Sequence, residues 1–320
     1  MKATVVIPNY NGIEYLDDCL KSLYRGTVVP EIIVVDNGSA DGSLEAIRAG
    51  YPEVRVISFR ENTGFSHAVN AGIREAVTEY VILLNNDTVV EQHFVERLIR
   101  AMEKKPFVFS AGAKMLSLKE PEMIDDAGDL YCCLGWAFAL GKGQRKDAYA
   151  KRARVFAACA GAAIYRKSVL EQLGGFDDNF FAYLEDIDVG YRAKAEGYDN
   201  LFIPEAVVYH AGSAVSGSRY NEFKVKLTAR NSVYLIYKNM PFLQILLNSP
   251  FLLAGFMVKW LFFLKKGLGG VYAKGLVDGV ILCSSTKGKK QKTPFLSENF
   301  GNYCRIQGEL WINLLRRILG

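Results

Sequence analysis

Four clusters of polar residues follow short apolar runs near the start of the chain, and their side chains could bind a nucleotide. The clusters are Pro8-Asn9-Tyr10-Asn11-Gly12, Asp36-Asn37-Gly38-Ser39, Glu61-Asn62-Thr63-Gly64-Phe65 and Asn85-Asn86-Asp87. Any one of them could be an ordinary turn, because Asn, Asp and Gly are good turn residues. If the apolar runs are parallel strands, all four clusters meet at one edge of the sheet, where open α/β folds bind ligands.

Individual side chains in these clusters suit different parts of a nucleotide. The ring of Tyr10 offers a face on which a base can stack, and Asp36 offers an acceptor for a base N–H. Asp87 is a hard oxygen ligand, of the kind that suits Mg²⁺ or Mn²⁺ bridging phosphates. The chain has neither a P-loop pattern nor a Gly-x-Gly-x-x-Gly pattern, which argues against P-loop and dinucleotide chemistry.

The elements that must position these clusters alternate between strands and helices, as in a series of βαβ units. Strands are predicted over residues 3–8, 31–35, 54–59 and 80–84. Apolar residues at helical spacing predict helices over residues 13–24, 43–49, 64–76 and 91–104. The strands are almost continuous apolar runs, which is typical of a sheet whose two faces are both covered by helices.

Composition places the chain among globular proteins of a reducing compartment. It has 320 residues, of which 50% are apolar and 23% charged, so there is ample material for a buried core. The six cysteines form no Cys-x-x-Cys pair, which excludes a zinc ribbon or a thioredoxin-type site. The first residues show no signal-peptide pattern. We therefore expect a cytoplasmic location.

Charge is distributed unevenly along the chain. Residues 1–220 carry a net charge of −6, whereas residues 221–320 carry +11. This distribution argues against a nucleic-acid groove and predicts a tail that meets an anionic lipid surface. The apolar stretch 241–264 is interrupted by Pro250, which favours an interfacial or re-entrant helix pair over a spanning helix. Residues 287–292 are expected to form a basic loop, and a homodimer contact through the tail stays open.

Four segments of the first half, in this order, resemble family 2 glycosyltransferases of the GT-A fold. The segments are Val5–Gly12, Val34–Ser43, Asn62–Phe65 with Asn70–Ile73, and Leu83–Thr88. The set is most similar to the bacterial rhamnosyltransferase-type branch that builds surface polysaccharides, and the resemblance covers about residues 3–235. It implies an α/β fold with a Rossmann-like mixed central sheet flanked by helices. The expected boundaries are a catalytic domain over 1–220, divided at 104/105 into nucleotide-binding and acceptor-binding halves, and an α-helical extension over 221–320.

The resemblance implies a nucleotide-sugar site on the first half. Asp36 would pair with the base, and Pro8 and Tyr10 would form the base pocket. Asp87 stands where the family has its Asp-x-Asp metal motif, so it would hold a divalent cation, Mg²⁺ or Mn²⁺. Because Asn85 and Asn86 stand where many members carry Asp, one carboxylate should hold this metal more loosely. The remaining expected donor-binding residues are Asn11, Asn62, Gly64, Asn70, Asn86 and Arg230.

The resemblance assigns the reaction to the second half. Asp186 takes the position of the general base, beside Glu185, and neighbouring carboxylates should raise the pKa of the base. Carboxylates at a helix start can equally be capping residues, and for Glu185 the two interpretations are balanced. His210, in the segment Tyr209–Ser216, would be the second metal ligand or a diphosphate partner. A hydrogen-bonded structural histidine is the alternative.

The implied activity is an inverting transfer of a sugar, rhamnose or another hexose, from a nucleoside diphosphate-sugar to a saccharide acceptor. An acceptor linked to a polyprenyl diphosphate, at the cytoplasmic face of the membrane, fits the apolar and basic tail. A sugar-1-phosphate nucleotidyltransferase fits poorly, because residues 9–14 contain no Arg or Lys. The alternative from another class is a non-catalytic, membrane-associated scaffold, which Asn85 and Asn86 support.

Overall fold

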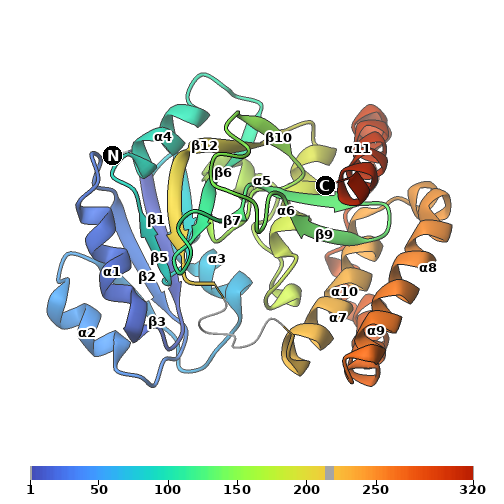
Figure 1. The fold of residues 1–320 in the computed structure, drawn as a ribbon, viewed down its shortest axis with the longest axis horizontal. Helices are drawn as coiled ribbons and strands as arrows, with labels where there is room; N and C mark the ends of the chain where they lie inside the picture. Colours follow the sequence, from blue (N-terminus) through green and yellow to red (C-terminus); the bar gives the residue numbers. More distant parts are fainter. Residues whose placement is uncertain (1, 213–219, 320) are drawn as a thin grey trace.

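A mixed ten-stranded sheet forms the centre of the computed structural model, which describes residues 2–212 and 220–319 (Figure 1). The strand order along the sheet is β10-β12-β6-β11-β4-β1-β2-β3, with β5 paired to β12 and β7 paired to β6. The first strands are β1 (Ala3–Asn9), β2 (Glu31–Asp36), β3 (Arg55–Ser58), β4 (Tyr80–Leu84) and β5 (Thr88–Val90). Pairing is parallel among β1–β4, so their carboxyl ends meet at one edge as predicted.

The second half of the sheet is largely antiparallel, because β11 runs against both β4 and β6. Its strands are β6 (Val108–Ser117), β7 (Ile124–Asp126), β10 (Ala153–Val155), β11 (Ala162–Arg166) and β12 (Asp199–His210). A separate hairpin joins β8 (Asp129–Cys132) to β9 (Trp136–Ala139). The change of direction turns the loops of this half back toward the carboxyl ends of β1 and β4.

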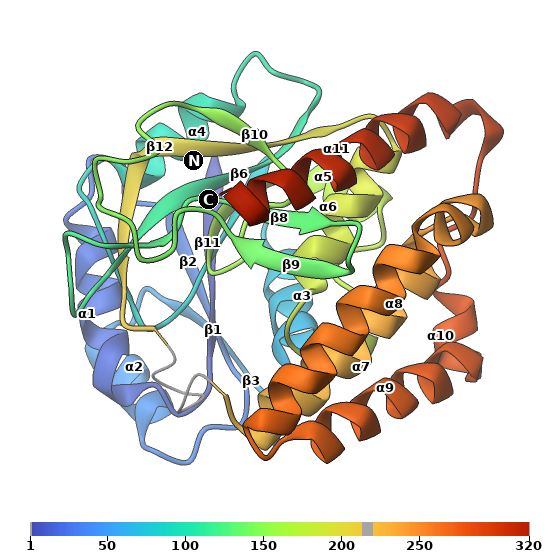
Figure 2. The ribbon, with the colours of Figure 1, turned by 45° about the vertical axis from the view of Figure 1, so that its right-hand side comes forward.

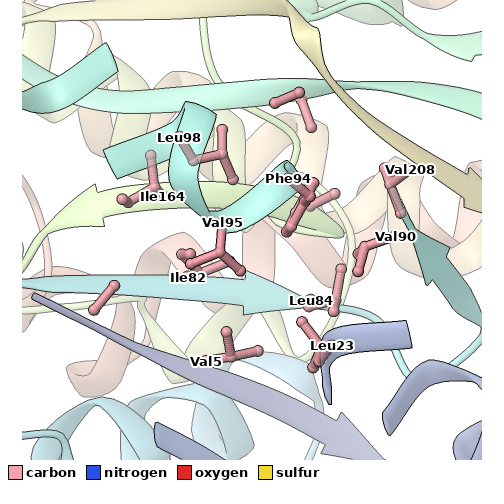
Figure 3. Packing of buried hydrophobic residues seen from close by; sticks show 14 of the residues in the cluster. Val5, Leu23, Ile82, Leu84, Val90, Phe94, Val95, Leu98, Ile164 and Val208 are labelled. Atoms are coloured by element: carbon pink, nitrogen blue, oxygen red, sulfur yellow. The ribbon is translucent and has the colours of Figure 1, made fainter. Parts of the chain in front are cut away.

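Helices cover both faces of the sheet, as the apolar strand pattern predicts. One face carries α1 (Ile13–Tyr24), α2 (Ser43–Gly50) and α4 (Phe94–Met102). The other carries α3 (Phe65–Glu75), α5 (Lys167–Gln172) and α6 (Glu185–Ala195). Alternation along β1 sends Val5 into the first core and Val6 into the second. Figure 3 shows the first core, where Leu98 and Phe94 of α4 lie against strand residues.

In the described part of the chain, a series of helices follows the sheet and gathers toward one end of the molecule, as Figures 1 and 2 show. They are α7 (Glu222–Asn239), α8 (Phe242–Lys265), α9 (Gly269–Ser284), α10 (Thr286–Lys290) and α11 (Phe300–Leu319). One apolar cluster continues from β8 and α6 into α7, α8 and α11, so the expected boundary near residue 220 is crossed by a shared core. The helical character of the extension is confirmed.

Two predictions about this extension are wrong. The stretch 241–264 is one continuous helix rather than a pair, because the Ser249 hydroxyl donates to the Leu246 carbonyl (2.8 Å) that the missing N–H of Pro250 leaves free. The basic stretch expected as a loop contains the short helix α10, whose first turn is capped by the Ser285 hydroxyl. By length and composition α8 could cross a membrane.

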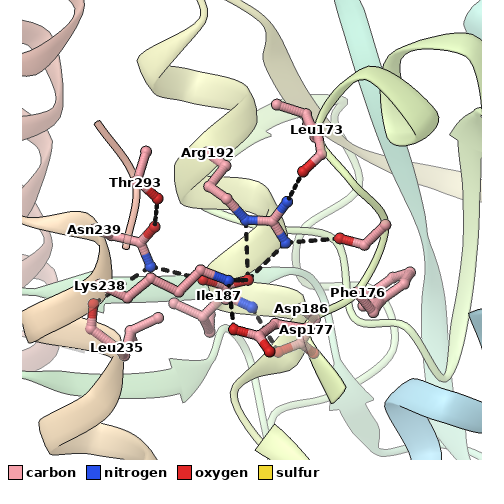
Figure 4. Close-up of polar contacts among 12 residues, drawn as sticks. Leu173, Phe176, Asp177, Asp186, Ile187, Arg192, Leu235, Lys238, Asn239 and Thr293 are labelled. Carbon is pink, nitrogen blue, oxygen red and sulfur yellow. Dashed lines mark hydrogen bonds and ion pairs between the residues drawn. The ribbon is translucent and has the colours of Figure 1, made fainter. Parts of the chain in front are cut away.

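A buried network of charged residues joins α7 to α6, and Figure 4 shows it. The Lys238 ammonium lies 2.8 Å from an Asp177 oxygen and 3.0 Å from Asp188, and Arg192 also donates to Asp188. Although burial raises the pKa of Asp188, the two cations lower it below its ordinary value. The two acids and two bases neutralise one another, which fixes α6, and the residues at its start, relative to α7.

Candidate active site

A cleft of about 950 Å³ lies between the carboxyl ends of β1 and β4 and the start of α6. Most of the predicted site residues line it. They are Pro8, Tyr10, Asn62, Gly64, Asn86, Asp87, Glu185, Asp186 and His210. The topology explains this convergence, because parallel strands deliver the first six from one edge while α6 and β12 deliver the other three from the opposite wall. The order of motifs in the sequence therefore corresponds to one site.

A chain of hydrogen-bonded side chains lies at the carboxyl ends of β1, β2 and β4, on one side of the cleft. The Asn86 side chain donates to the Asn9 oxygen (2.7 Å), and Asn9 in turn donates to Asp36 (2.9 Å). Asn9 is fully buried and also donates to the Ser43 hydroxyl at 2.9 Å. These polar groups satisfy one another, so this side of the cleft is preorganised.

Three predicted donor residues lie outside the cleft lining. Asp36 is 1% exposed and accepts from Asn9 and from the Ser39 N–H. Asn11 accepts from the Ala40 N–H (2.8 Å), which ties the loop after β1 to the loop after β2. Asn70 exchanges hydrogen bonds with the Phe176 backbone. These contacts give all three a structural role, and direct binding by them stays a prediction.

The fourth residue outside the lining, Arg230, supports the loop that leads to Glu185 and Asp186. It donates to the carbonyls of Asn179 and Phe180 at 2.7 and 2.8 Å. Its neighbour Asn231 is buried and donates to three carbonyls, those of Phe180, Ala182 and Tyr183. Donor binding by Arg230 stays a prediction.

The supported loop has a strained backbone. The backbone φ angles of this loop are positive at Phe181 (64°), Tyr183 (71°) and Leu184 (71°). Residues other than glycine rarely adopt such angles. Gly64 packs against it, and a Cβ there would lie 2.6 Å from the Phe181 carbonyl oxygen. Such strain persists only where surrounding contacts enforce it, and it gathers at functional sites. Glu185 and Asp186 follow directly.

A carboxylate and an imidazole face each other within the cleft. His210 Nε2 lies 3.3 Å from Asp87 Oδ1, and His210 Nδ1 lies 2.8 Å from Asp125 Oδ2. Burial lowers the pKa of His210, but Asp125 and Asp87 outweigh burial and raise it to about 9. The second part of the predicted histidine motif, 213–216, lies outside the described residues.

The pair fits a divalent cation. Asp87 supplies a carboxylate oxygen and His210 an imidazole nitrogen, and Asp125 orients the ring from its other nitrogen, as second-shell carboxylates do for metal-bound histidines. Asp125 was not identified in the sequence. Its only signal was the acidic run Asp125-Asp126-x-x-Asp129, which has no helical or strand periodicity.

Several carboxyl groups crowd the opposite wall. Glu185 is buried, and its Oε2 atom has no hydrogen-bond partner among the described residues. Asp186 accepts the Ile187 N–H at 2.7 Å, at the start of α6. Burial is the largest cause that raises the pKa of both groups. The predicted upward shift for the base thus has desolvation, rather than charge repulsion alone, behind it.

Asp126 and Asp129 also belong to this wall, and the sequence analysis missed them. Their carboxylate oxygens and the Cys159 sulfur lie within 4.8 Å of one another, a spacing that could hold a metal ion. Asp129 lines the cleft, whereas Asp126 is fully buried and accepts the Gly128 N–H at 2.5 Å. Burial raises the pKa of both.

Comparison with known proteins decides the family. Residues 4–174 match the model of Glycosyl transferase family 2. The chain belongs to this family. It is a glycosyltransferase, of the hexosyltransferase class, and this confirms the predicted enzyme over the predicted scaffold. The four N-terminal motifs that carried the resemblance all lie within the matched range.

Similarity to curated relatives shows that this family 2 transferase is rhamnosyltransferase-like. It is 28% identical over 236 residues to N-acetylglucosaminyl-diphospho-decaprenol L-rhamnosyltransferase of Mycobacterium tuberculosis, covering 64% of this chain and 75% of that protein. It is 30% identical over 216 residues to the uncharacterized glycosyltransferase YwdF of Bacillus subtilis, covering 67% and 75%.

Solved structures confirm the GT-A fold of this family 2 transferase. The mannosyltransferase PcManGT from Pyrobaculum calidifontis, in complex with GDP-Man and Mn²⁺, has a TM-score of 0.55 at 16% identity and covers 96% of this chain and 86% of its own. The S. aureus protein TarS (residues 1–349) with UDP-GlcNAc has a TM-score of 0.55 at 17% identity and covers 79% and 70%.

Proposed function

We propose that this family 2 transferase moves a hexose, rhamnose in particular, from a nucleoside diphosphate-sugar to a lipid-linked saccharide with inversion at the anomeric carbon. The observation that carries the proposal is that one cleft holds both the Asp87–His210 pair and the carboxyl group of Asp186. Inverting transfer needs both features, because the diphosphate leaves from one face of the sugar while a general base deprotonates the acceptor hydroxyl at the other face.

In this reaction the chain's own residues bind, orient and move a proton. Asp186 accepts the proton of the acceptor hydroxyl while the acceptor oxygen bonds to the anomeric carbon and the bond from that carbon to the diphosphate breaks. Tyr10, which is 36% exposed, stacks on the nucleobase of the donor, with Pro8 beside it. Glu185 offers its unpartnered Oε2 atom to a sugar hydroxyl.

Asp87 and His210 would hold the divalent cation, Mg²⁺ or Mn²⁺. When bound, such a cation neutralises charge on the leaving diphosphate. Two protein ligands leave the other coordination positions to phosphate oxygens and water, which suits a cation that arrives with the donor. The solved mannosyltransferase with GDP-Man and Mn²⁺ shares the fold, which supports this assignment.

The lipid-linked acceptor rests on the relative and on the extension. The name of the mycobacterial relative gives a decaprenyl-diphosphate acceptor and an L-rhamnosyl group. The exposed surface of α8 is apolar, whereas its buried side carries polar residues: Asn248 pairs with Gln307, and Gln244 with Tyr191. This arrangement is the reverse of a soluble amphipathic helix and supports contact with lipid at the cytoplasmic face of the membrane.

The basic residues favour an anionic lipid surface over a second copy of the chain as the partner of α8. Exposed lysines lie at the end of α8 and in the turn after it, on α9, and in and after α10: Lys265, Lys266, Lys274, Lys287, Lys289, Lys290 and Lys292. Two copies of so basic a surface would repel each other, whereas each lysine near an anionic membrane contributes about 1 kcal/mol to binding.

A thermal-shift screen tests the donor site. We expect one of UDP, dTDP and GDP to raise the Tm by a few degrees in the presence of Mn²⁺, because a ligand of the native state stabilises it by mass action. The Asp87→Ala variant should lose the metal-dependent part of this shift. The Asp147→Ala variant, changed at an exposed carboxylate outside the cleft, should keep all of it. No shift with any nucleotide contradicts the proposal.

Vesicle flotation tests the membrane contact. We expect the chain to float with vesicles containing phosphatidylglycerol and much less with pure phosphatidylcholine. The double variant Leu243→Ser/Leu253→Ser, changed at side chains 72% and 71% exposed on α8, should stay at the bottom. The matched control is Phe107→Ser, at a side chain 72% exposed elsewhere. If the double variant instead turns a dimer into a monomer, α8 is a dimer interface.

A further inference from the structure

Three carboxyl groups meet beneath the acceptor side of the cleft. Asp129 begins β8 and lies within hydrogen-bonding range of Asp186 on one side and of Asp126, the last residue of β7, on the other. The Asp129 and Asp186 side chains are half-buried and line the cleft, and Asp126 is buried behind them. Neighbouring carboxylates disfavour each other's ionisation, so we expect this group to hold at least one proton.

The hydrogen-bond donors around the group indicate which carboxyl is charged. Asp186 accepts the Ile187 N–H at 2.7 Å and the Ala160 N–H, and it lies at the positive end of the α6 dipole. Asp126 accepts the Gly128 N–H. In the described part of the chain, the contacts of the Asp129 carboxyl run to the other two acids. Negative charge is therefore best stabilised on Asp186, and the proton on Asp129.

We propose that Asp129 is a positioning residue that stays protonated and donates its O–H to Asp186, so that Asp186 is held ionised and in place to act as the base. The inference rests on the proposed function, because the base role of Asp186 is part of it. A hydrogen bond donated to an ionised carboxylate is short and strong, and it removes one rotational degree of freedom from the base. No second charge is then brought into the cleft.

The surroundings of Asp129 agree with a neutral side chain. Among the described residues, the titratable groups that interact with its carboxyl include Asp126, Asp186, the thiol of Cys159 and the hydroxyl of Tyr165, none of which is a cation. Asp125 and Lys142 act on Asp126, one layer further away. Burial, followed by the neighbouring acids, raises the pKa of Asp129 well above its ordinary value. The backbone on either side is fixed, since Asp129 exchanges hydrogen bonds with Ala157.

Transfer kinetics of three variants test the role. We expect Asp129→Ala to lower kcat by about 10- to 100-fold, since a misplaced catalytic group costs this much, with the KM of the donor unchanged. The amide of Asp129→Asn can still donate to Asp186, so this variant should recover at least tenfold of the loss. The control is Asp147→Asn, whose carboxylate is exposed. The proposal is overturned if Asp129→Asn is as slow as Asp129→Ala, as a metal ligand requires, or if Asp129→Ala is as fast as the wild type.

Infrared difference spectra locate the proton without any substrate. At pH 7, the wild type minus Asp129→Asn spectrum should contain the carbonyl stretch of a protonated carboxylic acid. The same difference for Asp147→Asn should contain carboxylate bands. Carboxylate bands in the Asp129 difference would show an ionised Asp129 and defeat the inference. If the wild type transfers no sugar from any nucleotide-sugar, the proposed function fails, while the spectra still decide the state of Asp129.

Discussion

The two walls of the cleft differ in how well the hydrogen bonds of their polar side chains are satisfied. On the donor side, Asn86, Asn9 and Asp36 form a closed chain of neutral amides ending in one satisfied carboxylate. On the acceptor side, Glu185 has an unpartnered oxygen, and the pKa of Asp186 is raised by burial. The polar groups of the donor wall have hydrogen-bond partners, whereas the acceptor wall holds a run of positive φ values and an unpartnered carboxyl oxygen.

We infer from this difference that the donor wall serves mainly to bind substrate and the acceptor wall mainly to promote the reaction. A preorganised amide wall binds its ligand without rearranging, and it contributes similarly to the ground state and to the transition state. A wall of desolvated carboxyls held by a strained loop costs stability, but it stabilises charge that moves during the reaction. We therefore expect substitutions on the donor wall to change KM and those on the acceptor wall to change kcat.

The largest effect should come from the base itself. Asp186→Asn should lower kcat by about 10²- to 10⁴-fold, because it removes general-base catalysis, with donor binding kept. Steady-state kinetics with the donor found in the thermal-shift screen measures this. The unchanged nucleotide-induced Tm shift is the control. A variant that retains more than a tenth of the wild-type kcat would place the base elsewhere in the cleft.

The next largest effect should come from the support of the strained loop. Asn231→Ala removes the donor to three carbonyls, so we expect kcat to fall about tenfold and stability to fall by about 1–3 kcal/mol. Kinetics and urea unfolding measure the two losses. The matched variant is Asn302→Ala, which removes one hydrogen bond to the Ala195 carbonyl outside the cleft. Equal losses of kcat in both variants would contradict a specific role for the loop.

A smaller effect, of the other kind, is expected on the donor wall. Asn9→Ala breaks the amide chain between Asn86 and Asp36, so the KM of the donor should rise about three- to tenfold while kcat stays within twofold. Initial rates over a range of donor concentrations separate the two constants. If kcat falls more than KM rises, the division of labour between the walls does not hold.

The smallest effect concerns stability against pH in the metal-free protein. The folded-state pKa of His210, about 9, lies above its ordinary value of 6.5, so protonation stabilises the fold. This contribution is fully present below about pH 6.5 and is lost as pH rises through 9. The Tm after EDTA treatment should fall over this range, more steeply than in His210→Gln. Parallel curves for the two proteins would exclude the contribution.

Periodic features were predictable from the sequence, and non-periodic ones were not. The first half follows from β-branched runs and helical spacing, because a sheet buried on both faces leaves an unambiguous pattern. Asp125, Asp126 and Asp129 lie in short strands and turns without a period, so nothing in their spacing marked them. The helix through Pro250 was missed because a serine hydroxyl replaces the lost donor, which is a tertiary detail.

The site prediction divides in the same way. Motif order correctly brought Asp87, Asp186 and His210 into one cleft, because the topology alone fixes where strand and helix ends meet. Asp36, Asn70 and Arg230 lie outside the cleft lining and hydrogen-bond within the protein, so their contact with a donor stays a prediction. Whether a polar side chain faces a ligand or a backbone carbonyl depends on its rotamer and its neighbours. Neither can be predicted from a single sequence.

The helical extension also supports the β8–β9 hairpin, which lines part of the cleft. It is held from one side by α11, through the Cys133 N–H to the Leu310 carbonyl, and from the other by α8, where Trp136 donates to the Gly255 carbonyl at 3.1 Å. Gly255 allows this approach, since a Cβ there would lie 2.2 Å from the Leu134 carbonyl oxygen. The same hairpin begins with Asp129 and supplies Phe138 to the cleft.

The extension therefore supports the fold around the cleft through these contacts. A shortened enzyme that ended before α7 would lose the clamp on both sides of the hairpin and expose its apolar underside to water. Such a chain would lose the support of the cleft wall that carries Asp129, together with the surface of α8 that we propose to contact lipid. Swapping the extension between relatives would likewise exchange part of the active site.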